Sequence, residues 1–259
     1  MSTPTPTHTD RSTTTMPEAI AFRDAARAVA PDRPTACAGW TALDLVAHVV
    51  AGGVEIARLV SARLAGRPVP PTQSFAEREP AARSLGHDVL LSFLDGAGVV
   101  DLIGQLPLGE VVPFTGWAMD REALATHVRS ELALHRWDLV GSDDLGVELL
   151  EAPELTVHAV RALESFDEIG ERSAARPRPT VGERAIRLRS DDRPDVVLTI
   201  GPTGSSVALA EPTDGPAVST DPAARLLMLW GRRPSAARHV VEYGLDDETR
   251  RVAEAWLFG

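Results

Sequence analysis

The stretch from Gly39 to Gly66, GWTALDLVAHVVAGGVEIARLVSARLAG, limits the folds open to this chain more than any other part of it. Thr41 and Asp44 form an acidic capping box, which predicts a helix that begins after Thr41 and runs to Gly66. This is the longest clear helix in the sequence. Three other helical stretches accompany it, so the first half of the chain is expected to be a bundle.

The other three stretches repeat apolar residues at helical spacing. The first helix is expected at about 17–30, and the Pro-rich segment 66–80 is expected to be a loop. Helical periodicity resumes at about 81–94. The buried stripe of this third helix is expected to be Leu85, Val89, Leu90 and Phe93. After a crossover broken by Gly and Pro, a fourth helix ends at Gly141, which suits a C-cap.

The sequence changes character after residue 143, where runs rich in β-branched residues appear. A helix near 153–170 comes first, and Asp221 before Pro222 predicts the start of a later helix. Three strands are expected between these helices, in the segments AIRLRS, DVVLTIG and SSVALAE, and DDETRRVAEAWLF should form a last helix. The predicted organisation is a disordered tail over 1–15, an all-α four-helix bundle over 16–143 and a smaller α+β domain over 144–259.

Composition argues against several classes of protein. The chain of 259 residues has 26 basic and 37 acidic side chains, and its formal net charge of -11 opposes binding to nucleic acid or to anionic membranes. We find neither the apolar core of a signal peptide nor an uninterrupted apolar run long enough to span a membrane, so a cytoplasmic protein is expected. No GxSxG, Walker A, GxGxxG or CxxC motif occurs. The single cysteine, Cys37, is either a packed small side chain or a free thiol.

Glu131 and His135 are four residues apart on the fourth helix, so their side chains face the same side of it. A bundle can add a third ligand from a facing helix, and the second helix carries His48 within an apolar stripe. Two histidines and one glutamate form the ligand set of catalytic zinc sites, where a fourth position stays open for water or substrate. The same set also suits Fe(II) or another divalent metal.

Simpler interpretations of these residues stay open. Glu131 and His135 could be an ordinary i,i+4 pair that stabilises the helix, and His48 could be a core histidine. His127 extends the pattern, but it is rotated by about 80° from His135 around the helix and is only a second candidate. Asp138 could orient an imidazole, or it could pair at the surface with Arg136 or Arg121.

Three segments together resemble one family: GWTALDLVAHVVAG, RSELALHRWDLVG and ARLLMLWGRRP. From about residue 16 onward, the chain is similar to the mycothiol-dependent maleylpyruvate isomerases. That resemblance implies a DinB-like metal-binding four-helix bundle followed by a small α+β domain similar to sterol-carrier folds. It places the metal ligands on His48, Glu131 and His135. It also implies that an arginine of the second domain reaches the cleft as a catalytic and cofactor-binding group, either Arg232, our first choice, or its neighbour Arg233.

The resemblance further implies a zinc ion whose open position binds mycothiol, a low-molecular-weight thiol. A free thiol has a pKa of about 8.5, and coordination to a divalent metal deprotonates it at neutral pH. The arginine could orient a carboxylate substrate. Addition of the thiolate to a cis double bond, rotation and loss of the thiol would make the protein an isomerase. Retention of the adduct would make it an S-transferase, and the sequence does not separate the two or identify the substrate.

Two other functions remain open from the sequence. The sterol-carrier-like domain could hold an apolar ligand as a non-catalytic binding module that needs no metal. A bundle that has lost its chemistry could act through protein partners, although the intact ligand set argues against this. For the enzyme, the expected partners are a small-molecule substrate and a thiol cosubstrate, without nucleic acid or membrane, in a monomer or dimer.

Overall fold

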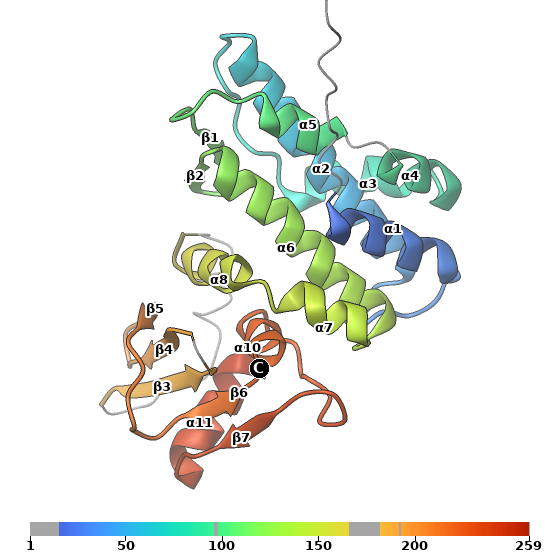
Figure 1. The fold of residues 1–259 in the computed structure, drawn as a ribbon. Coiled ribbons are helices and arrows are strands. Elements are labelled where there is room, and N and C mark those ends of the chain that lie inside the picture. Colours follow the sequence, from blue (N-terminus) through green and yellow to red (C-terminus); the bar gives the residue numbers. More distant parts are fainter. Residues whose placement is uncertain (1–15, 96–97, 166–181, 192, 259) are drawn as a thin grey trace, which may run out of the picture.

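The structure is a computed structural model that describes residues 16–95, 98–165, 182–191 and 193–258. A helical region comes first, and a five-stranded sheet with further helices follows it (Figure 1). The predicted fold class, a helical bundle followed by a smaller α+β region, is confirmed. The disorder predicted for residues 1–15 concerns residues outside this description.

The helical region is built around α1, α2 and α6. Helices α1 (Pro17–Ala28) and α2 (Ala42–Leu64) pack against α6 (Arg121–Val140), and Figure 1 shows α6 running along the centre of the region. The capping box predicted for α2 is present, because Thr41 accepts from the backbone N–H of Asp44 while Asp44 accepts from that of Thr41. Gly141 ends α6 with a φ of 78°, a conformation that glycine adopts without steric cost.

The expected single helix over 81–94 is wrong. Two helices replace it, α3 (Phe75–Arg83) and α4 (His87–Leu94), and Gly86 separates them with a φ of 79°. Helix α3 begins inside the predicted loop, because Ser74 and Glu77 form a capping box. Of the expected stripe only Leu90 is buried, because the break re-aims the helix; the exposed members are Leu85 (44%), Val89 (45%) and Phe93 (50%).

The crossover before α6 contains structure that the sequence did not predict. Helix α5 (Gly98–Gly104) is followed by a hairpin of two short strands, β1 (Val112–Phe114) and β2 (Trp117–Met119). Phe114 pairs with Trp117, so only Thr115 and Gly116 form the turn. This hairpin packs against α2 and α6 and closes one end of the helical region.

The C-terminal region confirms the three predicted strands. These are β3 (Arg184–Arg189), β4 (Asp195–Ile200) and β5 (Ser205–Ala210), and the sheet order is β5-β4-β3-β6-β7. The short strands β6 (Val218–Thr220) and β7 (Val241–Tyr243) were not predicted. Among the described strands of this sheet, the β3–β6 pair is parallel and the other pairs are antiparallel.

Among the described residues of this region, four helices connect to the sheet or lie beside it. Asp221 caps α10 (Pro222–Leu229) as predicted, and α11 (Asp247–Phe258) is the expected last helix. Helix α8 (Pro153–Ser165) begins where a helix was predicted, whereas α7 (Asp144–Leu150) was missed. Both α7 and α8 contact α6 on one side and α10 on the other. The domain boundary at 143/144 therefore stays a prediction.

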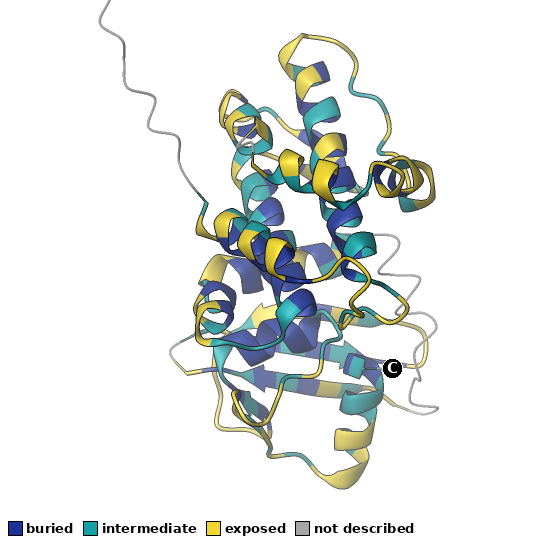
Figure 2. Ribbon diagram, turned by 90° about the vertical axis from the view of Figure 1, so that its right-hand side faces the viewer, coloured by how far each residue is buried: buried dark blue, intermediate teal, exposed yellow. Residues whose placement is uncertain are grey.

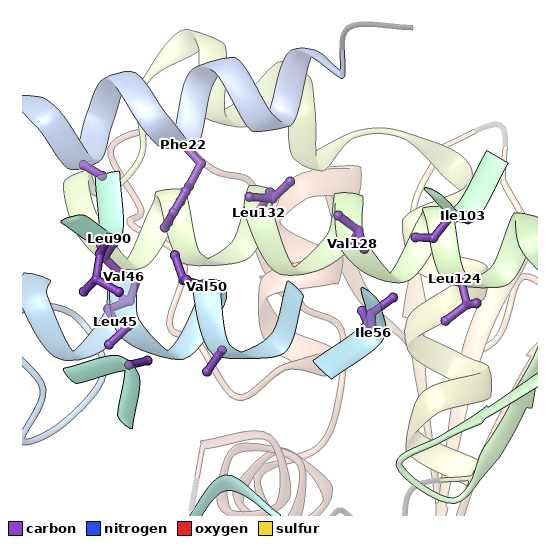
Figure 3. Packing of buried hydrophobic residues seen from close by; sticks show 14 of the residues in the cluster. Phe22, Leu45, Val46, Val50, Ile56, Leu90, Ile103, Leu124, Val128 and Leu132 are labelled. Carbon is purple, nitrogen blue, oxygen red and sulfur yellow. The ribbon is translucent and has the colours of Figure 1, made fainter. Parts of the chain in front are cut away.

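Two apolar clusters hold the protein together. The first lies between α1, α2 and α6, and in Figure 3 Phe22 points from α1 toward α2 and α6 near Val50 and Leu132. The second joins Leu134 of α6 to α8, α10 and the inward residues of the sheet, such as Leu198. Figure 2 shows the buried residues, in dark blue, along the helices of the first region and along the strands and helices of the second. Burial of this apolar area is the main stabilising term of such a fold.

Helix α2 is long and apolar enough to cross a membrane if length and composition alone are considered. Of its most apolar window, 56% is buried inside the protein, against α3, α5 and α6. A core helix of a bundle meets the same criteria of length and composition.

Candidate metal centre

The packing of α2 against α6 brings His48, Glu131 and His135 together. Nε2 of His48 lies 3.6 Å from Oε2 of Glu131, and Nε2 of His135 lies 3.5 Å from the same oxygen. The two imidazole rings meet edge to face with their centroids 5.0 Å apart. One ligand atom from each residue lies within 4.8 Å of the others. Two atoms bound tetrahedrally to one zinc ion at about 2.1 Å are about 3.4 Å apart, so the donor set fits a small divalent cation.

Each histidine is oriented from behind by a carboxylate. Nδ1 of His48 is 2.7 Å from Oε1 of Glu79, and Nδ1 of His135 is 2.8 Å from Oδ2 of Asp138. Because a carboxylate only accepts, each Nδ1 carries the proton and each Nε2 is directed toward Glu131. Metal-bound histidines are usually held by such carboxylates, which fix the tautomer and the ring orientation.

Glu79 was missed by the sequence analysis. It is 5% exposed, lies on α3 and also accepts a hydrogen bond of 2.9 Å from Arg83. The sequence carried one signal for it, the capping box of Ser74 and Glu77, which predicts a helix in the segment interpreted as a loop.

Arg232 reaches this site through Asp138. Its Nε donates to Oδ1 of Asp138 at 2.8 Å and its Nη2 donates to Oδ2 at 2.5 Å. The hydrogen-bonded chain Arg232–Asp138–His135, in which Asp138 and His135 are buried, thus links the segment after α10 to α6. Asp138 therefore does not pair with Arg136, which instead donates two hydrogen bonds to Asp143.

Arg233 points elsewhere. Its guanidinium lies 4.3 Å from the centroid of the Phe258 ring, on the last helix, and it is not among the residues that line the cavity described below. Of the two arginines considered from the sequence, Arg232 is the one near the histidines.

The charges of the site stabilise one another. Burial lowers the pKa of His135, but hydrogen bonds with Asp138, Cys37 and Glu131 outweigh it and raise that pKa well above its usual value. Burial raises the pKa of Glu131, but hydrogen bonds with His135 and His48 outweigh it and hold that pKa well below its usual value. A divalent cation would replace these shared protons and neutralise the carboxylate, which couples metal binding to proton release.

His127 lies outside this ligand group. Its Nδ1 is 3.2 Å from Nε2 of His158, and its ring contacts Phe114. Burial lowers the pKa of His127 and lowers that of His158 to about 3, so both rings are neutral near pH 7. In the part of the chain that the structure describes, neither potential metal-binding group contains His127.

The second potential group consists of Cys37, His135 and Asp138. Cys37 is a free, half-buried thiol that lies beside His135. Both interpretations of Cys37 from sequence hold, because it packs against the first apolar cluster and is also a free thiol in the cavity wall.

A cavity of about 1040 Å³ opens onto the three candidate ligands. Aliphatic and aromatic side chains from α1, α2, α4 and α5 form much of its wall, among them Ile20, Val49 and Phe93. Its charged wall includes Arg78 and Arg232. It is large enough for a small-molecule substrate together with a second molecule of similar size.

Comparison with known proteins identifies the helical region. Residues 16–140 match the family model described as the mycothiol maleylpyruvate isomerase N-terminal domain. These residues belong to that family. Two uncharacterized proteins from two strains of Mycobacterium tuberculosis are each 28% identical over 131 residues. That match spans 50% of this chain and 62% of the length of the relatives.

The isomerase fold extends beyond the N-terminal domain. A crystal structure of the mycothiol-dependent maleylpyruvate isomerase superposes with a TM-score of 0.56 and 16% identity, over 89% of this chain and 91% of that chain. A histidine-to-alanine mutant of the same isomerase gives a TM-score of 0.55 and 15% identity over the same shares. The sheet region therefore shares the fold of that isomerase as well.

Proposed function

We propose that this protein is a metal-dependent enzyme that uses a low-molecular-weight thiol, mycothiol, to isomerise or modify a small electrophilic substrate. His48, Glu131 and His135 would hold the metal, with zinc as the expected ion. The observation that carries the proposal is the convergence of two Nε2 atoms and one carboxylate oxygen at 3.5 and 3.6 Å, on the wall of a large cavity. Membership of residues 16–140 in the isomerase family supports it.

When bound, the metal supplies Lewis acidity that deprotonates a coordinated thiol at neutral pH. The chain's own residues do the rest. Glu79 and Asp138 keep the two imidazoles in the tautomer that presents Nε2, and the apolar wall excludes water from the reacting thiol.

The reaction proposed is addition of the thiol sulfur to an activated cis double bond. Rotation about the resulting single bond and elimination of the thiol give the trans isomer and regenerate the thiol. If elimination does not follow, the thiol stays on the product and the enzyme is an S-transferase. A cytoplasmic location, where small thiols stay reduced, agrees with either outcome.

Arg232 has a different role in this proposal from the one expected from sequence. Two of its N–H groups donate to Asp138, so its charge is already compensated by a carboxylate. We assign it to positioning: it fixes Asp138, which in turn fixes His135.

Metal analysis of purified protein tests the ligand set. Wild-type protein should carry about one zinc ion per chain, and His48→Ala and His135→Ala should lose it. His87→Ala, on α4 and outside both potential metal groups, is the matched control. Stoichiometric zinc in either ligand variant would refute the proposed metal site.

Incubation of the zinc-loaded protein with mycothiol and panels of electrophiles tests the reaction. Mass spectrometry should show an isomer with free thiol, or a stable thiol adduct, only with the metal-loaded protein. A change that proceeds equally well in His135→Ala would contradict the proposal.

The size and apolar wall of the cavity favour one alternative, a non-catalytic module that holds an apolar ligand. That function needs no metal. Binding of an apolar ligand that is equal in wild-type protein and in His135→Ala, with no thiol chemistry in either, would support it.

A further inference from the structure

The cavity that opens onto the candidate ligands has an apolar part that the proposed mechanism does not use. One wall of this part is the face of α2 that follows His48, and the other walls come from α1, α4 and α5, which pack around it. The residues that line it include Ile20, Gly52, Gly53, Val54, Phe93 and Val99.

Gly52 and Gly53 lie in the middle of α2, where glycine destabilises a helix relative to alanine. A glycine in such a place is usually explained by a positive φ or by a neighbour that packs too closely for a Cβ atom. Neither residue has a positive φ. A Cβ atom added to either would meet no heavy atom within 4 Å apart from its chain neighbours and the backbone of its own helix. The packing of α2 therefore does not require glycine at these two positions.

The two glycines leave a stretch of helix backbone open to the cavity. Gly52 is one turn of α2 after His48, so this stretch begins about 6 Å along the helix from a candidate metal ligand. Residues four apart share a face of a helix, so a side chain at position 52 would point to the same side as His48. A molecule held at the metal centre has room to extend along this open backbone.

Large apolar side chains around the open backbone are in contact with solvent. Ile20, Val54 and Phe93 all line the cavity, and they are 39%, 52% and 50% exposed. They come from three different helices, α1, α2 and α4, that enclose the same space. A ligand that covered them with apolar atoms would be bound by the removal of this surface from water.

The charged side chains that α1 and the end of α4 contribute to the cavity wall are Arg23 and Asp95. Arg23 forms an ion pair with Asp24, and Asp95 forms one with Arg27. Since each charge is compensated by a neighbouring side chain, this part of the cavity favours an uncharged group over an ion.

We infer that this part of the cavity, with Gly52 and Gly53 as its floor, binds an aliphatic chain of the substrate. The inference deepens the proposed function and rests on it. The substrate class is an α,β-unsaturated carbonyl compound that carries an uncharged alkyl chain. In the reaction the thiol sulfur bonds to the β-carbon and the thiol proton goes to the α-carbon, while the alkyl chain lies along α2. We call this part of the cavity the aliphatic site.

Calorimetric titration of the zinc-loaded protein with unreactive 1-alkanols, from butanol to octanol, tests the aliphatic site. The affinity of the wild type should rise about three- to fourfold for each added methylene. Gly52→Leu and Gly53→Leu should each weaken octanol binding by about 10-fold or more, the equivalent of two methylenes that no longer fit. Because the added side chains meet open space and leucine is a better helix former, the Tm of both variants should equal or exceed that of the wild type.

The control variant is Gly104→Leu, at an exposed glycine in α5 that does not line the cavity and whose Cβ position is also open. It should bind octanol like the wild type. Octanol affinity that is unchanged in both Gly52→Leu and Gly53→Leu, or wild-type affinity that does not rise with chain length, would overturn the aliphatic site. A clear fall in Tm in both variants would also overturn it, because the glycines would then be required by packing.

A second pair of measurements separates this inference from the proposed function. Alkanol binding should persist in His135→Ala, because the aliphatic site needs no metal. With mycothiol and zinc, the wild type should convert 2-octenal faster than 2-butenal, and Gly52→Leu should lose this preference. If alkanols bind as expected but no alkenal reacts with the thiol, the proposed function fails and the aliphatic site stands. If both alkenals react equally fast and alkanol affinity is independent of length, the aliphatic site fails and the proposed function stands.

Discussion

Replacing Asp138 by Asn tests the idea that the C-terminal region controls the metal centre. Asn keeps the size of the side chain but has a single acceptor oxygen, whereas Asp138 accepts from His135 and twice from Arg232. Loss of a carboxylate that orients a metal-bound histidine typically weakens metal binding 10- to 100-fold, or by about 1.4–2.7 kcal/mol. Competition with a fluorescent zinc chelator would measure this change.

The same substitution should also destabilise the metal-free protein. The side chain of Asp138 is 1% exposed and that of Arg232 is 17% exposed, so the variant leaves a largely buried guanidinium without its counter-charge. Breaking a buried ion pair in this way costs about 3 kcal/mol, which corresponds to a fall in Tm of about 6–12 °C. Arg232→Met should likewise weaken zinc binding, through Asp138 alone.

Glu254→Gln, which removes the partner of Arg250 in an exposed i,i+4 pair, is the control and should change stability by less than about 0.5 kcal/mol. Zinc affinity in Asp138→Asn equal to that of the wild type would refute the view that Asp138 orients a ligand. A lower Tm with unchanged zinc affinity would show that the Arg232–Asp138 pair is structural only.

Three further predictions follow from the described contacts. Glu79→Gln should weaken zinc binding about 10-fold in the chelator assay, because Glu79 orients His48; an unchanged affinity would contradict this. Burial lowers the pKa of His158 to about 3, so below about pH 6.5 the unfolded chain binds a proton that the folded protein does not, and the free energy of unfolding falls. Urea unfolding of His158→Gln from about pH 7 to 4 should therefore show a shallower fall than the wild type, by up to about 1.4 kcal/mol per pH unit, and parallel curves would disprove the assignment. Thr115→Gly should raise the free energy of unfolding, measured by urea titration, by about 1 kcal/mol, and a loss of stability would argue against backbone strain at the turn.

Local sequence signals were sufficient for most of the regular structure. The capping box at Thr41, the glycine at the end of α6 and the Asp221–Pro222 start of α10 were each recognised because they act within a few residues. The division of the third helix was missed because the apolar spacing continues through Gly86, while the backbone turns there.

The short elements were harder to predict for a related reason. Strands β6 and β7 have three residues each, too few to show a period. Strand β6 forms because it pairs with β3, and β7 forms because it pairs with β6. Their existence depends on pairing across the sheet rather than on their own composition.

The sequence by itself determined the longer helices, the three six-residue strands and the choice of candidate ligands, because side-chain spacing along a helix fixes which groups share a face. His48, Glu131 and His135 were selected on that basis together with the family resemblance. Only the tertiary structure decided which side chains orient these candidate ligands through hydrogen bonds. Glu79 behind His48 and Arg232 behind Asp138 come from elements far apart in the chain. Such contacts depend on how elements pack, and no periodicity along the sequence records that packing.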